Sequence, residues 1–550
     1  MRIRLEEKPF QILELLLEAP GRVITRKALC DRLWPGTFVG YSHSLNTAVN
    51  KLRELLGDSA QSPRFVETIP RRGYRFVAPV EKSGKSPSGH GKTMLAVLPF
   101  ENLDGAAEQE YFADGLTEEM ISQLGQLDPK LLGVIARTSA IQYKSTKKPI
   151  GAIAAELGVG HILEGSVRRD GARIRIAAQL IEARDQTHLW SATYDRELRD
   201  IFSVQQEVAK HVGKALAIEL LPANPSPSVT ADPDAHEAYL QGRFFWGKRS
   251  EGELKKAIEC FERALSIDPA CARSYSGIAD CYGLLCWFGA FPPREAGPRA
   301  ETAALRALAL DDSRSEVHAS LGLVRYWYNW DWKGAEREFL RAIELNPSYA
   351  TARQWYAAYL NAMGRFEEAQ KELKSARELD PFSLIIRMNA ADPFFYARQF
   401  DRAIEHLHTL LEHEPEFLPA LFNLGRAYVQ MGLYDEAIAA FQKTVQTSGN
   451  RQSLPVLAHA YALAGRTADA IGILEDLNKQ EDGRYTASPL LARIYLGLGR
   501  KDKAFEALQR GIEERSFWIT MLKVDPVYDG IRSDPRFREL LKKVGLYQSS

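Results

Sequence analysis

Apolar residues recur at helical spacing in two separate parts of this chain. Near the N-terminus the pattern predicts three short amphipathic helices, at residues 9–20, 26–34 and 42–57, with Gly21, Pro35 and Gly57 as their stop signals. From residue 234 to 515, helical segments recur in pairs. Between these parts, apolar runs of strand length alternate with helical segments. The pattern predicts a multidomain, mainly α protein with a small α/β part in its middle.

A basic hairpin follows the third N-terminal helix. Residues 64–80, RFVETIPRRGYRFVAPV, alternate like two short strands around a turn that carries Arg71 and Arg72. The helix turns its apolar residues inward and leaves these polar residues for another molecule: Asn46, Thr47, Asn50, Lys51 and Arg53. A polar helix face beside a basic hairpin suits a DNA groove and its flanking phosphates, so we expect DNA binding here.

Three stretches carry a resemblance to a known family: KPFQILELLL in the first helix, LNTAVNKLRELLGD in the third and PRRGYRFVAP in the hairpin. Together they resemble the C-terminal effector domain of OmpR/PhoB-type response regulators, in the version found in CadC/ToxR-like regulators, over residues 2–80. The resemblance implies a winged helix at residues 1–80 whose third helix lies in the major groove of double-stranded DNA. It also implies groove and phosphate contacts by Thr47, Asn50, Lys51 and Arg53, wing contacts by Arg71, Arg72 and Arg75, and core positions for Tyr74 and Phe76.

The chain departs from that family at its start. The family begins with a small sheet, and only Arg2–Leu5 could supply its last strand, so we expect a truncated domain or a misplaced Met1. Neither a receiver domain nor a membrane segment, both common companions of this module, is recognised in the sequence. We therefore expect the input signal to reach the DNA reader through the rest of the chain.

Residues 81–92 are typical of a flexible linker, rich in Gly, Ser and Lys. The stretch SPSGHGKT at residues 86–93 ends like a Walker A loop, which would make the chain a nucleotide-dependent signalling enzyme built on Lys92 and Thr93. The loop lacks its first Gly, and an apolar strand rather than a helix follows it. We therefore favour a linker and expect no cofactor.

Residues 93–221 show the alternation of a small α/β domain. AVLPFEN, FADGLTEE and LEGSVRR resemble the TolB amino-terminal-like domain, which brings no agreed activity. Asp114, Glu118 and Glu119 are expected to form a solvated acidic helix face. The sequence has no GxSxG, HExxH or phosphate-binding loop and no metal-ligand spacing of Cys and His, so we expect neither an enzyme nor a metal site.

Past a Pro-rich linker at residues 222–233, small residues recur every 33 or 34 positions: Ala335, Ala369, Ala403, Ala437, Ala470 and Ala504. Turns such as MGRFEEA and MGLYDEA precede them, and the pattern resembles tetratricopeptide repeats. We predict an α-solenoid of about seven to eight repeats at residues 234–515, with a degenerate second repeat around Phe291–Arg299. Residues 516–550 are expected to cap it.

Such solenoids bind protein segments in a concave groove. Asn389 and Asn423 are 34 residues apart at the same first-helix position, where tetratricopeptide domains often hold the ligand backbone, and Arg426 lies nearby on the same helix as Asn423. These residues predict a weak site for a protein or peptide partner. A solvated polar face is the alternative interpretation, and self-association into a homo-oligomer is another use of the repeats.

Charge is unevenly distributed along the chain. The net charge is zero, with 71 basic and 71 acidic residues, but residues 1–80 hold 13 basic and 8 acidic residues and so carry +5. This places a nucleic-acid face at the N-terminus only. No stretch could span a bilayer and no signal peptide is seen, so we expect a cytoplasmic protein without membrane contact.

The leading hypothesis is a sequence-specific DNA-binding transcriptional regulator. The alternative is a tetratricopeptide interaction scaffold with a degenerate DNA-binding domain.

Overall fold

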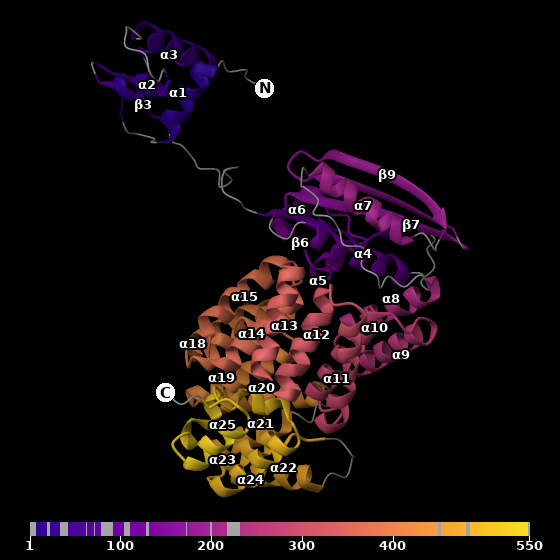
Figure 1. Cartoon of the computed structure of the whole chain (residues 1–550). Helices are drawn as coiled ribbons and strands as arrows, with labels where there is room; N and C mark the ends of the chain where they lie inside the picture. The colour runs from indigo at the N-terminus through magenta and orange to yellow at the C-terminus, as the bar shows by residue number, and fades with distance from the viewer. Residues whose placement is uncertain are drawn as a thin grey trace. The chain divides into compact units, whose positions relative to one another are not determined.

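The computed structural model describes residues 7–18, 23–33, 42–61, 63–70, 72–78, 92–103, 110–127, 131–171, 173–197, 201–216, 232–448, 453–479 and 485–547. The chain divides into two compact units, Met1–His90 and Gly91–Ser550, which Figure 1 draws in indigo and in purple to yellow respectively. Each unit encloses its own hydrophobic core.

The N-terminal unit is a winged helix. Its elements are α1 (Glu7–Glu18), β1 (Ile24–Thr25), α2 (Arg26–Leu33), α3 (Ser42–Leu56), β2 (Val66–Ile69) and β3 (Gly73–Phe76). The strands form an antiparallel sheet in the order β1-β3-β2. The three helices and the hairpin confirm the predicted pattern. Strand β1 was not predicted, because two residues are too few for an alternation signal, and Arg2–Leu5 lie outside the described residues.

The core of this unit combines the apolar stripes of the helices with the hairpin: Ile12, Leu16, Leu29, Leu33, Leu45, Val49, Leu52, Val66, Tyr74 and Phe76 are buried. Tyr74 and Phe76 thus occupy the predicted core positions. Gly73 is the glycine of the RRGYRF motif, and no larger residue fits at this position: a Cβ there would lie 1.9 Å from the carbonyl oxygen of Ile24. Only glycine lets β1 and β3 approach this closely.

The second unit begins with an α/β domain. It contains β4 (Thr93–Val97), β5 (Glu101–Asn102), α4 (Glu110–Gly125), β6 (Leu132–Val134), α5 (Arg137–Ala140), α6 (Ile150–Leu157), β7 (His161–Asp170), β8 (Arg173–Glu182), β9 (Thr187–Glu197) and α7 (Ile201–Ala215). The sheet order is β6-β4-β7-β8-β9, with β4 parallel to β6 and β7 and the pairs β7–β8 and β8–β9 antiparallel. Because β4 starts at Thr93, a strand and not a helix follows the Walker-like sequence.

A helical solenoid forms the rest of the unit. Its helices are α8 (Pro233–Gly247), α9 (Glu251–Ile267), α10 (Ala272–Trp287), α11 (Pro293–Leu310), α12 (Ser315–Val324), α13 (Trp332–Leu345), α14 (Ala350–Met363), α15 (Phe366–Leu379), α16 (Leu384–Asn389), α17 (Asp392–Tyr396), α18 (Phe400–His413), α19 (Leu418–Met431), α20 (Tyr434–Ser448), α21 (Leu454–Leu463), α22 (Thr467–Lys479), α23 (Ser488–Gly497) and α24 (Lys501–Glu513). They pack as hairpins from α8 with α9 to α23 with α24 (Figure 1). The six periodic alanines are all buried, as close helix packing requires.

The irregular places of the solenoid differ from the predicted one. The second repeat, expected to be degenerate around Phe291–Arg299, is a complete hairpin in which α11 accommodates Pro298. The interruption lies instead in a later repeat, whose first helix is split into α16 and α17. Helix α12 also continues as a π-helical turn at Arg325–Asn329.

A C-terminal segment packs on the last hairpin. It consists of the 3-10 turns η6 (Phe517–Met521) and η7 (Pro526–Ile531) and the helix α25 (Pro535–Lys543). Tyr528, Ile531 and Phe537 are buried in one cluster with Leu508 of α24. This cluster closes the end of the solenoid, whose last apolar face would otherwise be exposed.

Candidate nucleic-acid interface and the inner face of the repeats

Helix α3 presents a polar stripe on the outside of the N-terminal unit. Leu45, Val49 and Leu52 are buried, whereas four of the residues predicted to contact DNA are exposed: Asn46, Thr47, Asn50 and Lys51. Positions i, i+1, i+4 and i+5 of a helix lie on one face, so these four side chains form one surface. We call it the polar stripe.

Arg53, the fifth predicted helix contact, is not part of that surface. Its side chain is only 6% exposed, and its Nη2 donates to the carbonyl oxygen of Val66 at 2.8 Å and to Oγ1 of Thr68 at 2.7 Å. Arg53 therefore ties α3 to β2, and the prediction that it is available to DNA is wrong. Helical spacing alone could not show that β2 packs against this position.

The two described arginines predicted as wing contacts have different surroundings. Arg72 is exposed at the turn, and its backbone is held by Ile69 and Arg26: its N–H donates to Ile69 O at 3.0 Å, and its carbonyl accepts from Arg26 N at 3.1 Å. Arg75 is half-buried, and its Nε donates to Glu67 Oε2 across the hairpin at 2.9 Å. Arg71 lies outside the described residues. Arg72 thus has the position that suits a phosphate contact beside the polar stripe.

Asp58 fixes the chain between α3 and the wing. Its carboxylate accepts from the backbone N–H groups of Ser59, Arg64, Phe65 and Val66. Burial raises the pKa of Asp58, but these backbone donors outweigh it and bring the pKa below its ordinary value. The charged carboxylate therefore helps to set where β2 begins relative to α3.

The residues predicted to hold a partner in the solenoid groove are bonded within the chain. Nη2 of Arg426 donates to Oδ2 of Asp525 at 3.2 Å, and Nη1 donates to Oδ1 of Asn423 at 3.3 Å. Asn389 accepts from Gln354 at 3.0 Å and donates to Asp392 at 2.8 Å. All three residues predicted to hold a partner thus make side-chain hydrogen bonds within the chain.

Asp525 belongs to the C-terminal segment and binds two arginines of different repeats. Besides Arg426 on α19, Nη2 of Arg493 on α23 donates to the same Oδ2 at 2.6 Å, and all three side chains are buried. Burial raises the pKa of Asp525, but Arg493 and Arg426 reverse this and lower it below the ordinary value. The carboxylate thus remains charged inside the solenoid.

Further contacts extend this segment along the same face of the repeats. The rings of Tyr326 and Phe517 meet edge to face with centroids 6.3 Å apart. The Nε1–H of Trp332 donates to Val544 O at 2.8 Å, and Arg398 pairs with Asp529 at 2.6 Å. We call the surface that carries these residues the inner face. It is covered by the chain's own C-terminal segment from α12 to α23.

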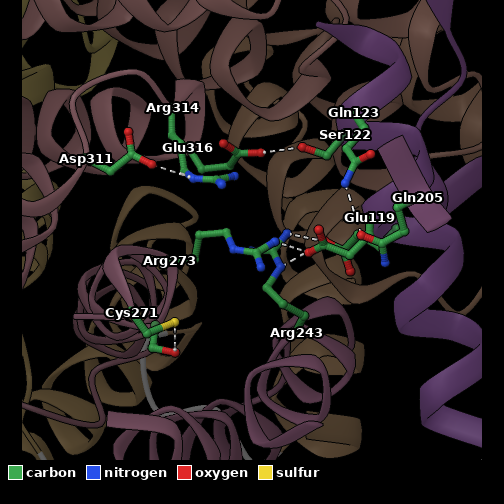
Figure 2. A network of polar contacts seen from close by, with 12 residues as sticks. Glu119, Ser122, Gln123, Gln205, Arg243, Cys271, Arg273, Asp311, Arg314 and Glu316 are labelled. Atoms are coloured by element: carbon green, nitrogen blue, oxygen red, sulfur yellow. Dashed lines mark hydrogen bonds and ion pairs between the residues drawn. The ribbon is translucent and has the colours of Figure 1, made fainter. Parts of the chain in front are cut away.

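At the other end of the solenoid, helix α4 of the α/β domain packs on α8 and α10. Glu119 of α4 pairs with Arg273 of α10, as Figure 2 shows, and both side chains are buried. Glu118 accepts from Arg243 of α8 at 2.6 Å. Asp114 is also buried, and the prediction of a solvated acidic face is wrong. Glu118 and Glu119 instead join the α/β domain to the repeats, whereas Asp114 pairs with Arg137 and Lys144 inside the α/β domain.

Candidate metal and membrane elements are absent from the described part of the chain. Its His, Cys, Asp and Glu side chains form no group of three that could hold a metal ion. None of its helices combines the length and apolar character that crossing a bilayer requires. Its five cysteines are unpaired, and four are buried.

Comparisons with known proteins agree with this arrangement. Residues 1–76 match the family described as "Transcriptional regulatory protein, C terminal", and residues 91–211 match the second domain of HilA/YgeH-like transcriptional regulators. Tetratricopeptide repeat families match residues 248–271, 338–371, 394–454 and 490–516. The chain has the domains of a DNA-binding transcriptional regulator. Its repeats supply a region of the kind that interacts with proteins.

Three relatives indicate how far the likeness extends. The regulator HilA of Salmonella typhimurium is 22% identical over 456 residues, 81% of this chain and 79% of that protein. The cholera toxin transcriptional activator of Vibrio cholerae is 42% identical over 80 residues, 14% of this chain and 27% of its own length. A Rhizobium meliloti protein named as adenylate cyclase 3 is 36% identical over 247 residues, 44% of this chain and 41% of that protein. The chain thus spans less than half of the cyclase's length.

Proposed function

We propose that this protein regulates transcription by binding specific duplex DNA sites through the polar stripe of α3 and the wing. The observation that carries the proposal is the exposure of Asn46, Thr47, Asn50 and Lys51 on one helix face beside Arg72. The face stands on a hydrophobic core to which the helices and the hairpin both contribute, which argues against a degenerate DNA-binding domain. The match of residues 1–76 to a regulator family supports the same function.

We propose that two copies of the chain act together. A single winged helix buries little surface, and its phosphate contacts weaken with salt, so one module binds DNA poorly. The unit Gly91–Ser550 supplies the larger surface for self-association or for a protein partner. Because Asp525 and the C-terminal segment cover much of the inner face, a partner binds another surface of the repeats unless it displaces that segment.

The resemblance of residues 93–221 to TolB amino-terminal-like domains stays a prediction.

The first test is genome-wide DNA capture with the full-length protein. The altered protein carries Asn50→Ala, Lys51→Ala and Arg72→Ala, and leaves the structural Arg53 in place. A control carries Lys255→Ala, Lys256→Ala and Gln241→Ala, three changes on the repeats. Like the altered protein, this control loses two basic groups and one amide. We expect discrete sites with the unaltered protein and the control, and their loss in the altered protein.

A salt titration on a recovered site completes the test. Each lost phosphate contact should reduce the slope of log affinity against log salt by about 0.9. The proposal fails if the unaltered, folded protein recovers no discrete sites, and the interaction scaffold then becomes the better account.

A further inference from the structure

A three-residue hydrogen-bond network joins the polar stripe to the wing and to α2. Nη1 of Arg26 donates to the hydroxyl of Tyr74 at 2.9 Å, and that hydroxyl donates to Oδ1 of Asn46 at 2.7 Å. Nη2 of Arg26 also donates to Oδ1 of Asn46. The guanidinium lies over the Tyr74 ring, with 5.3 Å between Cζ and the ring centroid. Asn46 is thus held by both neighbouring elements, α2 and the wing.

This network fixes which end of the Asn46 amide faces outward. A guanidinium has only donors, so the amide atom beside Arg26 must be the oxygen. A carbonyl oxygen has two lone pairs, and here Arg26 and Tyr74 use both of them. Asn46 is exposed, and among the described residues none accepts a hydrogen bond from its Nδ2. What remains for another molecule is therefore the NH2 group alone.

We infer that Arg26 and Tyr74 are positioning residues that make Asn46 an obligate donor toward DNA. The inference rests on the proposed DNA-binding function and specifies the chemistry of one of its contacts. Asn46 donates to an acceptor on the duplex: a phosphate oxygen, a purine N7, guanine O6 or thymine O4. It does not make the bidentate contact of asparagine with adenine, because that contact also needs the amide oxygen to accept from the adenine 6-amino group.

The test uses the full-length protein and the tightest duplex recovered by DNA capture. Asn46→Asp keeps the shape and the oxygen that faces Arg26 but replaces the outward NH2 by an acceptor. We expect it to lower affinity by at least about tenfold, because a donor to DNA is replaced by a repelling oxygen. Gln61→Glu adds the same charge at an exposed position outside the stripe and should change affinity by less than about threefold. Equal affinities of the two variants would overturn the inference.

A second measurement examines the positioning role. Tyr74→Phe frees one lone pair of the Asn46 Oδ1. With Asn46 in place, this change should lower the affinity for the duplex by about three- to tenfold; in a protein that already carries Asn46→Ala, it should leave the affinity unchanged. A purely structural tyrosine would lower affinity equally in both backgrounds. Hydrogen exchange of the hairpin amides verifies that each variant is folded.

Base analogues separate the two modes of contact. Each adenine of the recovered duplex is replaced in turn by purine, which lacks the 6-amino group. If one replacement weakens the unaltered protein but not Asn46→Ala, the contact is bidentate and the inference fails. If the unaltered protein recovers no duplex at all, it is the proposed function that fails, and the inference fails with it.

Discussion

Helices α3 and α19 both carry asparagine and arginine side chains, but different neighbours surround them. On α3 the polar stripe is exposed, although Asn46 is bonded to Tyr74 of the wing, and Arg53 is buried against β2. On α19 Arg426 is buried against Asp525, and Asn423 is bonded to Arg426. One face is left for another molecule, whereas the other has been taken by the chain itself.

The difference follows from where the chain goes after each helix. The hairpin after α3 returns to one side of the helix and leaves the stripe open, while the C-terminal segment returns along the inner face of the repeats. A buried guanidinium must have a charged or polar partner, because burying a charge alone costs several kcal/mol. Arg426 and Arg493 therefore depend on Asp525, whereas the side chain of Lys51 is exposed to water.

The largest effect is expected from Asp525→Ala. This change leaves the guanidinium groups of Arg426 and Arg493 buried without their carboxylate, and should lower the free energy of unfolding by about 3–5 kcal/mol. Thermal unfolding of the full-length protein measures it. The control is Asp529→Ala, whose carboxylate is half-exposed beside Arg398 and Arg532, with an expected loss below about 1 kcal/mol. Equal losses would show that the inner face is not closed by Asp525.

A smaller effect should distinguish Arg53 from Lys51. Arg53→Ala removes hydrogen bonds from a charged donor to β2 and should destabilise the N-terminal unit by about 1.5–3 kcal/mol, seen as faster hydrogen exchange of the β2 and β3 amides. Lys51→Ala should leave exchange unchanged within about 0.5 kcal/mol and reduce DNA affinity instead. If Lys51→Ala destabilised the unit as much as Arg53→Ala, the polar stripe would not be an open face.

Asp58 gives the N-terminal unit a pH dependence. Because its folded pKa is lowered, the stability it contributes is present above its unfolded pKa, near 4, and is lost as pH falls through the folded value. Asp58→Asn places an NH2 group against backbone N–H donors and should cost about 1 kcal/mol at neutral pH. Hydrogen exchange of the hairpin amides should show that the difference in stability between the unaltered protein and Asp58→Asn shrinks below about pH 4. A difference that stayed constant with pH would rule out this role of the charge.

The smallest effect is expected from Asn423→Ala. Its amide oxygen makes a 3.3 Å contact with Arg426, whose charge is already paired with Asp525, so the loss in unfolding free energy should be within about 0.5 kcal/mol. The informative readout is binding of a protein partner once one is identified. Loss of that binding without loss of stability would show that the inner face opens to partners.

Much of the architecture could be read from the sequence, because it depends on local signals. The period-34 alanines, the RRGYRF turn of the hairpin and the spacing of leucines in α3 are each visible in the order of residues alone. The winged helix and the solenoid follow the predicted pattern. Four of the five helix residues predicted to face DNA are exposed for the same reason: one helical stripe is apolar and the other polar.

The tertiary structure decided what covers each polar face. Arg53 meets Val66 across 13 residues, Arg426 meets Asp525 across 99, and Glu119 meets Arg273 across 154. No local pattern encodes such partners, since a solvated charge and a buried, paired charge look alike in a sequence. The sequence by itself therefore determined the elements, the repeat and the exposed stripe of α3. The fold alone decided which arginines and carboxylates are buried together. Long-range packing removes these groups from water, and a charge that has left water needs an opposite charge beside it.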